Sequence, residues 1–599
     1  MPNISDMSAA VSNSVLFSTE FLAIPAGGGD QLVWNQTTGE KEILSGQDVE
    51  ILRICQRPRS ISEHLDSMEE DWGYRPEWSE FQGMWQDLVN KGWLLSVETF
   101  QQSFNAKAAT ESAKKPVHIS ALTIPMRAVG PALVRCLKSV EPHMQENGRK
   151  MELILVSEQD DVDAAREVVG NMTCDMEPRW IGPREREVFI RWLVKETTLS
   201  LELCAYALKP DVPEIKIGAL RNAQLLECVD QHYLSTDDDT VWDLRRPRTS
   251  SEATILGGFE AALWNYEPLT TEALNYGEKV ASNIFERHEA FLGKSASELI
   301  AAAKTLKIYG LDLTLRKSLN NPHSRVGMSV TGYRGDAAFT DFSTLLSFPK
   351  NEIPPWFQES SAYQSFLSAQ EVSVSGAGLL CGNFCAAGMG MALDATAELP
   401  PFPPLHRNED GLFQLFLQHN QQRLLSVGLP ETLYHKRQET RLLAHTYAES
   451  LQADPSMDKW VSLLFHSYQE GSVVRDTSSF GIWLRESITH EPESMTKYLV
   501  SIYDQYIWNA RTTLSMAFKG KQLPAVFRSD LNKATQILEE KLLNSTPVWP
   551  REFQGRAEPL TDFLKELCLL GELLEKWPLF LAAARHHKQV GQRLSVALR

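Results

Sequence analysis

The sequence predicts an α/β protein with a small winged-helix α+β domain before it and an α-helical region after it. Two successive strand–helix units, "VHISALTIPMRAVGPALVRCLKSV" and "KMELILVSEQDDVDAAREVVG", predict a parallel sheet covered by helices. A hairpin pattern upstream predicts the small domain, and apolar residues at helical spacing beyond about residue 440 predict the helical region.

The small domain is expected over residues 17–100, after a polar tail at 1–16. "VLFSTEFLAIP" and "DQLVWNQ" read as strands around a glycine turn, and "TTGE" reads as a second turn. Ser45 is the predicted N-cap of one helix, Ser60 and Ser62 are the candidate caps of a second, and Gly92 is predicted to end a third. The polar stretch "QQSFNAKAATESAKKP" predicts a linker over 101–116.

The α/β domain is expected over 117–440 and the helical region over 441–599. Ligands of parallel sheets bind at the carboxyl ends of the strands, and Asp237–Asp239 follow such a predicted end at Tyr233-Leu234. In the helical region we expect a Met and aromatic stripe to form core, and His586-His587 to lie on the surface.

Composition narrows the function classes. A formal net charge of -18 argues against a general nucleic-acid binder, which needs a basic surface. Eight cysteines without a CxxC pair argue against a disulfide framework or a zinc ribbon, and the pair Cys381 and Cys385 is expected to pack. Neither a signal peptide nor a membrane span is predicted, so we expect a cytoplasmic protein.

The stretch "YLSTDDDTVW" allows two interpretations. Taken alone, three adjacent aspartates favour a solvated loop, although hard divalent cations also prefer oxygen ligands beside phosphates. Its surroundings contain Gly218-x-x-Arg221-Asn222 upstream, and downstream "GLLCGNFCAAG" and the Pro-rich "PPFPPLHRNEDGLF". "NPHSRVGMSVTGYRGDAAF" has the glycines of a loop near a site, but no mechanism follows from it.

These elements, in this order over roughly 117–440, resemble the family 2-like glycosyltransferases of the GT-A fold. The resemblance implies a Rossmann-like GT-A domain and a metal-dependent, inverting hexosyltransferase that uses a nucleotide-sugar, above all a UDP-sugar. Asp410 would be the catalytic base, with Glu409 beside it, because the acceptor must lose a proton as it attacks. Asp239, in the family's Asp-x-Asp element, and His435 would ligate Mn²⁺ or Mg²⁺.

The same resemblance assigns two further sets of residues. On the acceptor side it places Gly382, Asn383 and Arg407, the last as a charge partner of the carboxylates. Glu158 stands where the family usually has an aspartate, for which Asp160 or Asp161 could compensate. The nucleotide-sugar site as a whole would be formed by Pro125, Arg127, Glu158, Arg221, Asn222, Asp237 and Asp238.

Residues 17–100 resemble the PqqD-like leader-recognition domains of systems that modify ribosomally made peptides, through "NQTTGEKEIL", the helix after it and "SISEHL". The resemblance implies capture of a precursor's leader by strand addition at a sheet edge. The acceptor would then be a Ser, Thr or Cys side chain of that precursor. Winged helices also bind DNA, but this segment is not basic. A glycan or small-molecule acceptor, and a non-catalytic binding protein on a degenerate transferase scaffold, remain alternatives.

Overall fold

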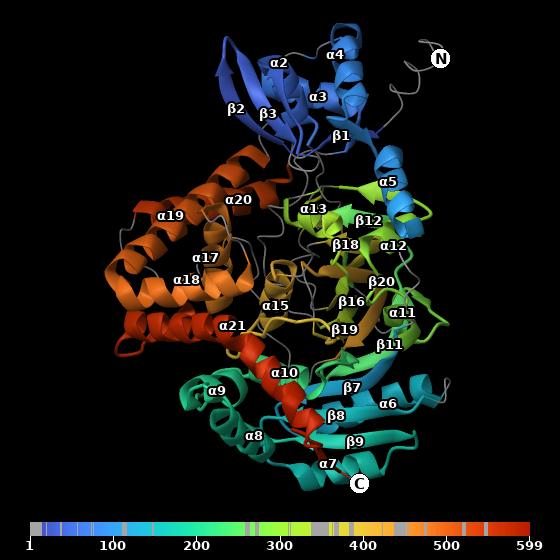
Figure 1. Cartoon of the computed structure of the whole chain (residues 1–599), viewed down its shortest axis with the longest axis vertical. Helices are drawn as coiled ribbons and strands as arrows, with labels where there is room; N and C mark the ends of the chain where they lie inside the picture. Colours follow the sequence, from blue (N-terminus) through green and yellow to red (C-terminus); the bar gives the residue numbers. More distant parts are fainter. Residues whose placement is uncertain are drawn as a thin grey trace.

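A computed structural model shows an N-terminal domain, an α/β body and a helical region that flanks both (Figure 1). The residues that the structure describes are 15–19, 21–35, 39–56, 58–73, 75, 77–110, 117–145, 149–257, 264–269, 275–309, 311, 313–336, 359–361, 363, 371–382, 388–421, 423–436, 448, 451, 454–471, 476–517, 523–543 and 549–598. The expected tail therefore lies almost wholly outside them.

The N-terminal domain combines two small antiparallel sheets, in the orders β2-β3-β4 and β5-β1-β6, with three helices. Its elements are β1 (Val15–Ser18), β2 (Phe21–Gly27), β3 (Asp30–Asn35), β4 (Lys41–Ser45), α2 (Gly46–Ile54), β5 (Arg59–Ser60), α3 (Ile61–Trp72), α4 (Trp78–Asn90) and β6 (Leu94–Ser96). The predicted caps are confirmed: Ser45 and Ser60 each form a capping box with the acidic residue three positions later. Trp85 and Trp93 lie in the core.

The predicted linker differs from the structure. Helix α5 (Val97–Thr110) occupies its first ten residues, and 111–116 lie outside the described residues. Phe104 is 2% exposed in the core of the α/β body, and the Gln101 amide donates to the carbonyls of Ile300 and Ala303 at 3.2 and 2.8 Å. The segment thus joins the two domains as a packed helix, because its Phe100 and Phe104 lie one turn apart on an apolar stripe.

The α/β prediction is confirmed as a mixed sheet with the order β15-β12-β18-β20-β16-β19-β10-β7-β8-β9-β21. Strands β10, β7, β8 and β9 run parallel to one another toward the β21 end of this order. Strand β19 pairs antiparallel with both β10 and β16. The first half contains β7 (Ile119–Met126), α6 (Pro131–Gln145), β8 (Met151–Ser157), α7 (Val162–Gly170), β9 (Met176–Ile181), α8 (Pro183–Glu196), α9 (Leu201–Leu208), α10 (Ile217–Glu227), β10 (His232–Ser235) and β11 (Thr240–Arg246).

The second half extends the sheet beyond β19. Its elements are β12 (Thr254–Gly257), β13 (Trp264–Leu269), β14 (Glu278–Lys279), α11 (Ile284–Glu289), α12 (Ala296–Ala301), β15 (Leu306–Ile308), α13 (Leu313–Asn320), β16 (Val326–Gly335), β17 (Glu371–Gly376), β18 (Leu379–Gly382), β19 (Met391–Asp394), α15 (Glu409–Gln418) and β20 (Leu425–His435). Strands β16 and β20 are buried along nearly their whole length, so this half forms the centre of the body.

The helical prediction for the C-terminal region is confirmed for most of its described length. The elements are α17 (Met457–Gly471), α18 (Thr477–His490), α19 (Pro492–Ala517), α20 (Ala525–Leu543), the 3₁₀ turn η5 (Arg551–Phe553), α21 (Pro559–Gln589) and the short strand β21 (Val596–Ala597). Met495, Leu499 and Tyr503 lie in the core of this region, as predicted.

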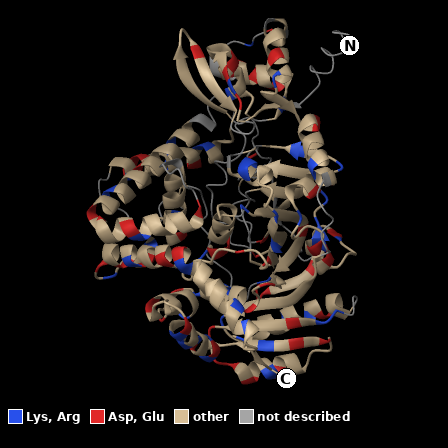
Figure 2. Ribbon diagram, viewed as in Figure 1, with Lys and Arg blue, Asp and Glu red and all other residues tan. Residues whose placement is uncertain are grey.

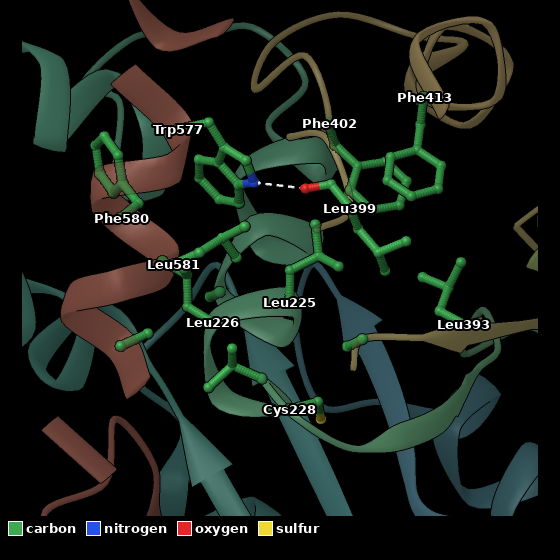
Figure 3. Packing of buried hydrophobic residues seen from close by; sticks show 14 of the residues in the cluster. Leu225, Leu226, Cys228, Leu393, Leu399, Phe402, Phe413, Trp577, Phe580 and Leu581 are labelled. Atoms are coloured by element: carbon green, nitrogen blue, oxygen red, sulfur yellow. Dashed lines mark hydrogen bonds between the residues drawn. The ribbon is translucent and has the colours of Figure 1, made fainter. Parts of the chain in front are cut away.

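Helix α21 also packs on the α/β body. Trp577 and Leu581 of α21 lie against Leu225 and Leu226 of α10, and the Trp577 indole donates to the Leu399 carbonyl at 2.9 Å (Figure 3). Strand β21 pairs with β9 at the sheet edge, so the end of the chain belongs to the sheet rather than to a separate helical region. The surface prediction for His587 is wrong, since its ring is 9% exposed and lies 4.4 Å from the Trp192 ring.

Among the helices of the described residues, none is both long and apolar enough to cross a membrane.

Candidate functional site

The candidate site lies where the strand order of the parallel segment reverses. Strand β7 comes first in the chain, β8 and β9 follow on one side of it, and β10 lies on the other. The carboxyl ends of β7 and β10 are adjacent, with Ser235 opposite Thr123. A crevice outside such a reversal is the usual ligand position in parallel α/β sheets. Asp237–Asp239 directly follow β10, as predicted.

Arg221 is the centre of the site. Its guanidinium is 1% exposed and donates three hydrogen bonds: Nη2 to Asp237 at 2.7 Å, Nε to Glu409 at 3.0 Å and Nη1 to Ser235 at 3.0 Å. Burial opposes the positive charge, but the carboxylates of Asp237 and Glu409 outweigh it and raise the pKa of Arg221. One cation therefore joins the aspartate after β10 to the carboxylates that begin α15.

Gly218 and Asn222 hold helix α10 against the Pro-rich segment. A Cβ on Gly218 would lie 1.8 Å from the Pro403 carbonyl, so this contact requires glycine. The buried Asn222 amide donates to the carbonyls of Ala207 and Phe402 and accepts from the Phe402 amide at 2.8 Å. The predicted nucleotide contact of Asn222 is therefore wrong. Its buried side chain is hydrogen-bonded to backbone groups in the core and positions the segment that leads to Glu409.

Glu409 and Asp410 begin helix α15 and differ in accessibility. Glu409 is buried, whereas Asp410 is partly exposed and accepts from the Gly388 amide at 2.8 Å. Burial first, and then the charge of Asp410, raise the pKa of Glu409. The pKa of Asp410 is also raised, chiefly by burial, with Arg221 opposing the shift. Asp410 is thus the carboxylate of the pair that solvent reaches, with a pKa raised above the ordinary aspartate value.

Asp239 and His435 meet as a pair. His435 Nε2 lies 3.0 Å from Asp239 Oδ1, and Nδ1 bonds the Asp336 carbonyl. Metal-bound histidines usually hydrogen-bond their second ring nitrogen in this way. Among the residues described, no group of three His, Cys, Asp or Glu could hold a metal ion. Asp239 and His435 are thus the two side chains here that could contribute ligands to a cation, and any further ligands would have to come from phosphates or water.

Asp238 lies between these two groups. Burial, together with the charges of Asp239 and Asp237, raises its pKa to about 7. The three neighbouring carboxylates are therefore not equivalent: Asp237 pairs with Arg221 and Asp239 pairs with His435, whereas Asp238 is the one whose pKa is raised.

The remaining predicted donor-side residues are spread along the same edge. Pro125 is buried in β7, Arg127 is exposed just beyond that strand, and Glu158 is partly exposed at the end of β8. Asp161 accepts from the Val129 amide at 2.6 Å, and Asp160 pairs with Arg184 at 2.5 Å. Asp161 thus holds the loops together.

Of the predicted acceptor-side residues, the structure describes Gly382 and Arg407. Gly382 is packed against Gly257, and its carbonyl accepts from Gln418 at 3.1 Å. Asn383 lies outside the described residues. Arg221 is the cation bonded to Glu409, and Arg407 is exposed, so the role of Arg407 as a charge partner of the carboxylates stays a prediction.

Four residues that help to build the site were not predicted from the sequence. Ser235 and Gln224 complete the buried hydrogen-bond chain from Arg221, and the backbone of Gly388 binds Asp410. A Cβ on Gly388 would lie 1.9 Å from Arg221 Nη2, so this position requires glycine. The glycines of "GMGM" are therefore the sequence feature that could have pointed to this contact. Asp336 supplies its carbonyl to His435, which places Asp336 beside the site.

Neither a family model nor a curated protein matches this chain. Among solved structures, it is similar to a chain of the E. coli microcin synthetase McbBCD complex with pro-MccB17 bound. The identity is 9%, the match covers 31% of this chain and 70% of that one, and the TM-score is 0.10. A TM-score this low does not establish a shared fold.

Proposed function

We propose that the chain is a metal-dependent glycosyltransferase with a GT-A-like, Rossmann-like catalytic domain. One observation carries the proposal: Arg221 binds Asp237 and Glu409 at once, across 188 residues of sequence between Arg221 and Glu409. A diphosphate-bearing donor and a deprotonating carboxylate must lie within reach of one sugar carbon, and this arrangement brings the two predicted motifs to that separation.

Asp239 and His435 would hold a divalent cation, which would supply charge neutralisation for the leaving diphosphate. Asp237, fixed by Arg221, is placed to accept hydrogen bonds from a donor's sugar or ribose hydroxyls.

Asp410 would take the proton of the acceptor as the acceptor atom bonds to the anomeric carbon and the bond from that carbon to the diphosphate breaks. The nucleoside diphosphate leaves with the electron pair of the broken bond. The Gly388 and Gly411 amides orient both Asp410 oxygens, and each oxygen keeps a lone pair for the acceptor. An attack opposite the leaving group would invert the configuration.

The acceptor proposed is a Ser, Thr or Cys side chain of a ribosomally made peptide whose leader binds the N-terminal domain. Strand β4 (Lys41–Ser45) pairs with β3 alone among the described strands, which leaves one edge open for strand addition. Tethering would raise the effective concentration of the acceptor at the site. Nucleic acid is a poor ligand for this edge, because β4 and α2 carry three acidic and two basic side chains.

The test is intact mass spectrometry of candidate precursor peptides incubated with the protein, Mn²⁺ and a panel of nucleotide-sugars. A hexose-sized mass increase that requires the leader and is lost in Asp410→Asn supports the proposal. The Glu167→Gln variant, altered on the exposed face of α7, should behave like wild type. Transfer to a free sugar or glycan but not to any peptide would favour the alternative acceptor class, and nucleotide binding without turnover would favour a non-catalytic protein.

A further inference from the structure

The outer face of sheet β2-β3-β4 is apolar and uncovered. Large side chains on this face are exposed by 37–62%, against 0–3% for Val33 and Leu44 on the inner face. The exposed residues are Leu22 and Ile24 on β2, Leu32 and Trp34 on β3, and Ile43 on β4. We call these five residues the outer patch.

The outer patch is continuous across the three strands. Leu22 is paired with Trp34, Ile24 with Leu32, and Leu32 with Ile43, so cross-strand neighbours on one face are apolar throughout. Strands β2 and β3 are almost free of charged residues (Figure 2). A sheet in a small α+β domain buries one face and usually solvates the other. In this domain the outer face of the sheet is therefore apolar although it is not part of the domain's own core.

The area of the outer patch indicates what kind of partner it can bind. Five large side chains, each roughly half exposed, offer on the order of 400 Å² of apolar surface, the size of functional patches on monomers. A stable dimer needs about 800 Å² from each partner. Three strands roughly 4.8 Å apart make a strip that matches one helix of about 10–12 Å diameter.

The backbone of the occupant gives a second criterion. A chain that lies on a sheet face cannot pair with the sheet's backbone, so its own N–H and C=O groups must already be bonded. A helix meets this condition within itself, whereas an extended peptide would leave the backbone groups that face the sheet unpaired. Charges at the two ends of the outer patch also suit a helix: Asp30 lies on the same face beyond Leu32, and Lys41 lies with its Nζ 5.2 Å from the Trp34 ring centroid.

We propose that the outer patch docks one amphipathic helix, about three turns long, of the peptide substrate. The proposal rests on the proposed function in taking that helix to belong to the peptide. Asp30 and Trp34 are four residues apart on β3, which is roughly 13 Å, or about nine residues of helix. The docked helix should therefore carry an apolar stripe flanked by a basic residue near Asp30 and an acidic one near Lys41, about nine positions apart.

The test uses a phage-displayed library of 20-residue peptides panned on the full chain. Enriched peptides are synthesised, and their Kd values are measured by fluorescence anisotropy with wild type, Ile24→Ser, Trp34→Ser and the control Val188→Ser. Val188 is 63% exposed on α8, whereas Ile24 is 51% exposed on β2, away from the open edge of β4. Thermal unfolding followed by circular dichroism verifies that each variant is folded.

We expect amphipathic helical peptides whose Kd rises at least tenfold with Ile24→Ser and Trp34→Ser and stays unchanged with Val188→Ser. Equal binding to all four proteins, or failure to enrich any amphipathic peptide, would overturn the docking proposal. So would self-association of wild type in sedimentation velocity that Ile24→Ser abolishes, since a second copy would then be the occupant. Absence of sugar transfer with helix binding intact would instead count against the proposed function alone.

Discussion

Replacing Arg221 with Met removes the positive charge while keeping most of the side-chain volume. Three hydrogen bonds are lost, and the carboxylates of Glu409 and Asp237 lose their common partner. Glu409 is nearly inaccessible to water, so it cannot recover solvation. Breaking a buried ion pair on one side costs about 3–5 kcal/mol, and this is the loss in the free energy of unfolding that we expect near pH 8.

The loss should depend on pH with a definite sign. The pKa of Glu409 is already raised by burial and by Asp410, and removal of Arg221 raises it further. A carboxyl whose pKa is higher in the folded state than in the unfolded state stabilises the fold at low pH, and this contribution is lost as pH rises through the folded-state pKa. The deficit of Arg221→Met should therefore shrink from pH 8 to pH 5.5.

The assay is urea unfolding of both proteins at the two pH values, followed by circular dichroism. Arg585→Met is the control, because Arg585 and its partner Asp230 are accessible to solvent and such pairs contribute about 1 kcal/mol or less. A deficit below about 1 kcal/mol at pH 8, or one that grows on acidification, would refute the assignment of Arg221 as the bridging cation.

Three further changes test the neighbouring groups. Gly388→Ala would place a Cβ 1.9 Å from Arg221 Nη2, so we expect sugar transfer to fall at least tenfold, whereas Gly130→Ala, with open space around its Cβ, should leave transfer unchanged in the same assay. The rate of transfer should decline as pH is lowered through a pKa above the ordinary aspartate range, because burial raises the pKa of Asp410 and only its ionised form accepts a proton; a flat rate between pH 8 and 5 would contradict this role. Removing metal with EDTA should abolish transfer, and His435→Ala should need about tenfold or more Mn²⁺ for half-restoration, read from a Mn²⁺ titration of the rate.

The features that could be predicted from the sequence are those set by residues close together in the chain. The capping boxes at Ser45 and Ser60 depend on residues three positions apart, and both form. The position of Asp237–Asp239 at a strand end follows from the short apolar run before them. The segment 101–110 was mistaken for a linker because Ala, Lys and Gln suit both flexible chains and helices.

Distant pairings could not be predicted from sequence. The bond between Arg221 and Glu409 joins residues 188 positions apart on two different helices, and no local pattern connects them. Asn222 belongs to the same motif as Arg221, yet one position along a helix turns its side chain toward Phe402 and the core. Strand β21 is two residues long, which is too short for a recognisable pattern, and it pairs with β9 at the edge of the sheet.

The proposed reaction moves a sugar from a nucleotide donor, with Asp410 as the base. The decisive experiment measures the release of nucleoside diphosphate from a panel of nucleotide-sugars in the presence of Mn²⁺, with water as the acceptor, for wild type and Asp410→Asn. We predict release from at least one donor, strongest among UDP-sugars, and a rate of release in Asp410→Asn that is lower by about 100-fold or more. No release from any donor, or equal rates for the two proteins, would contradict the account.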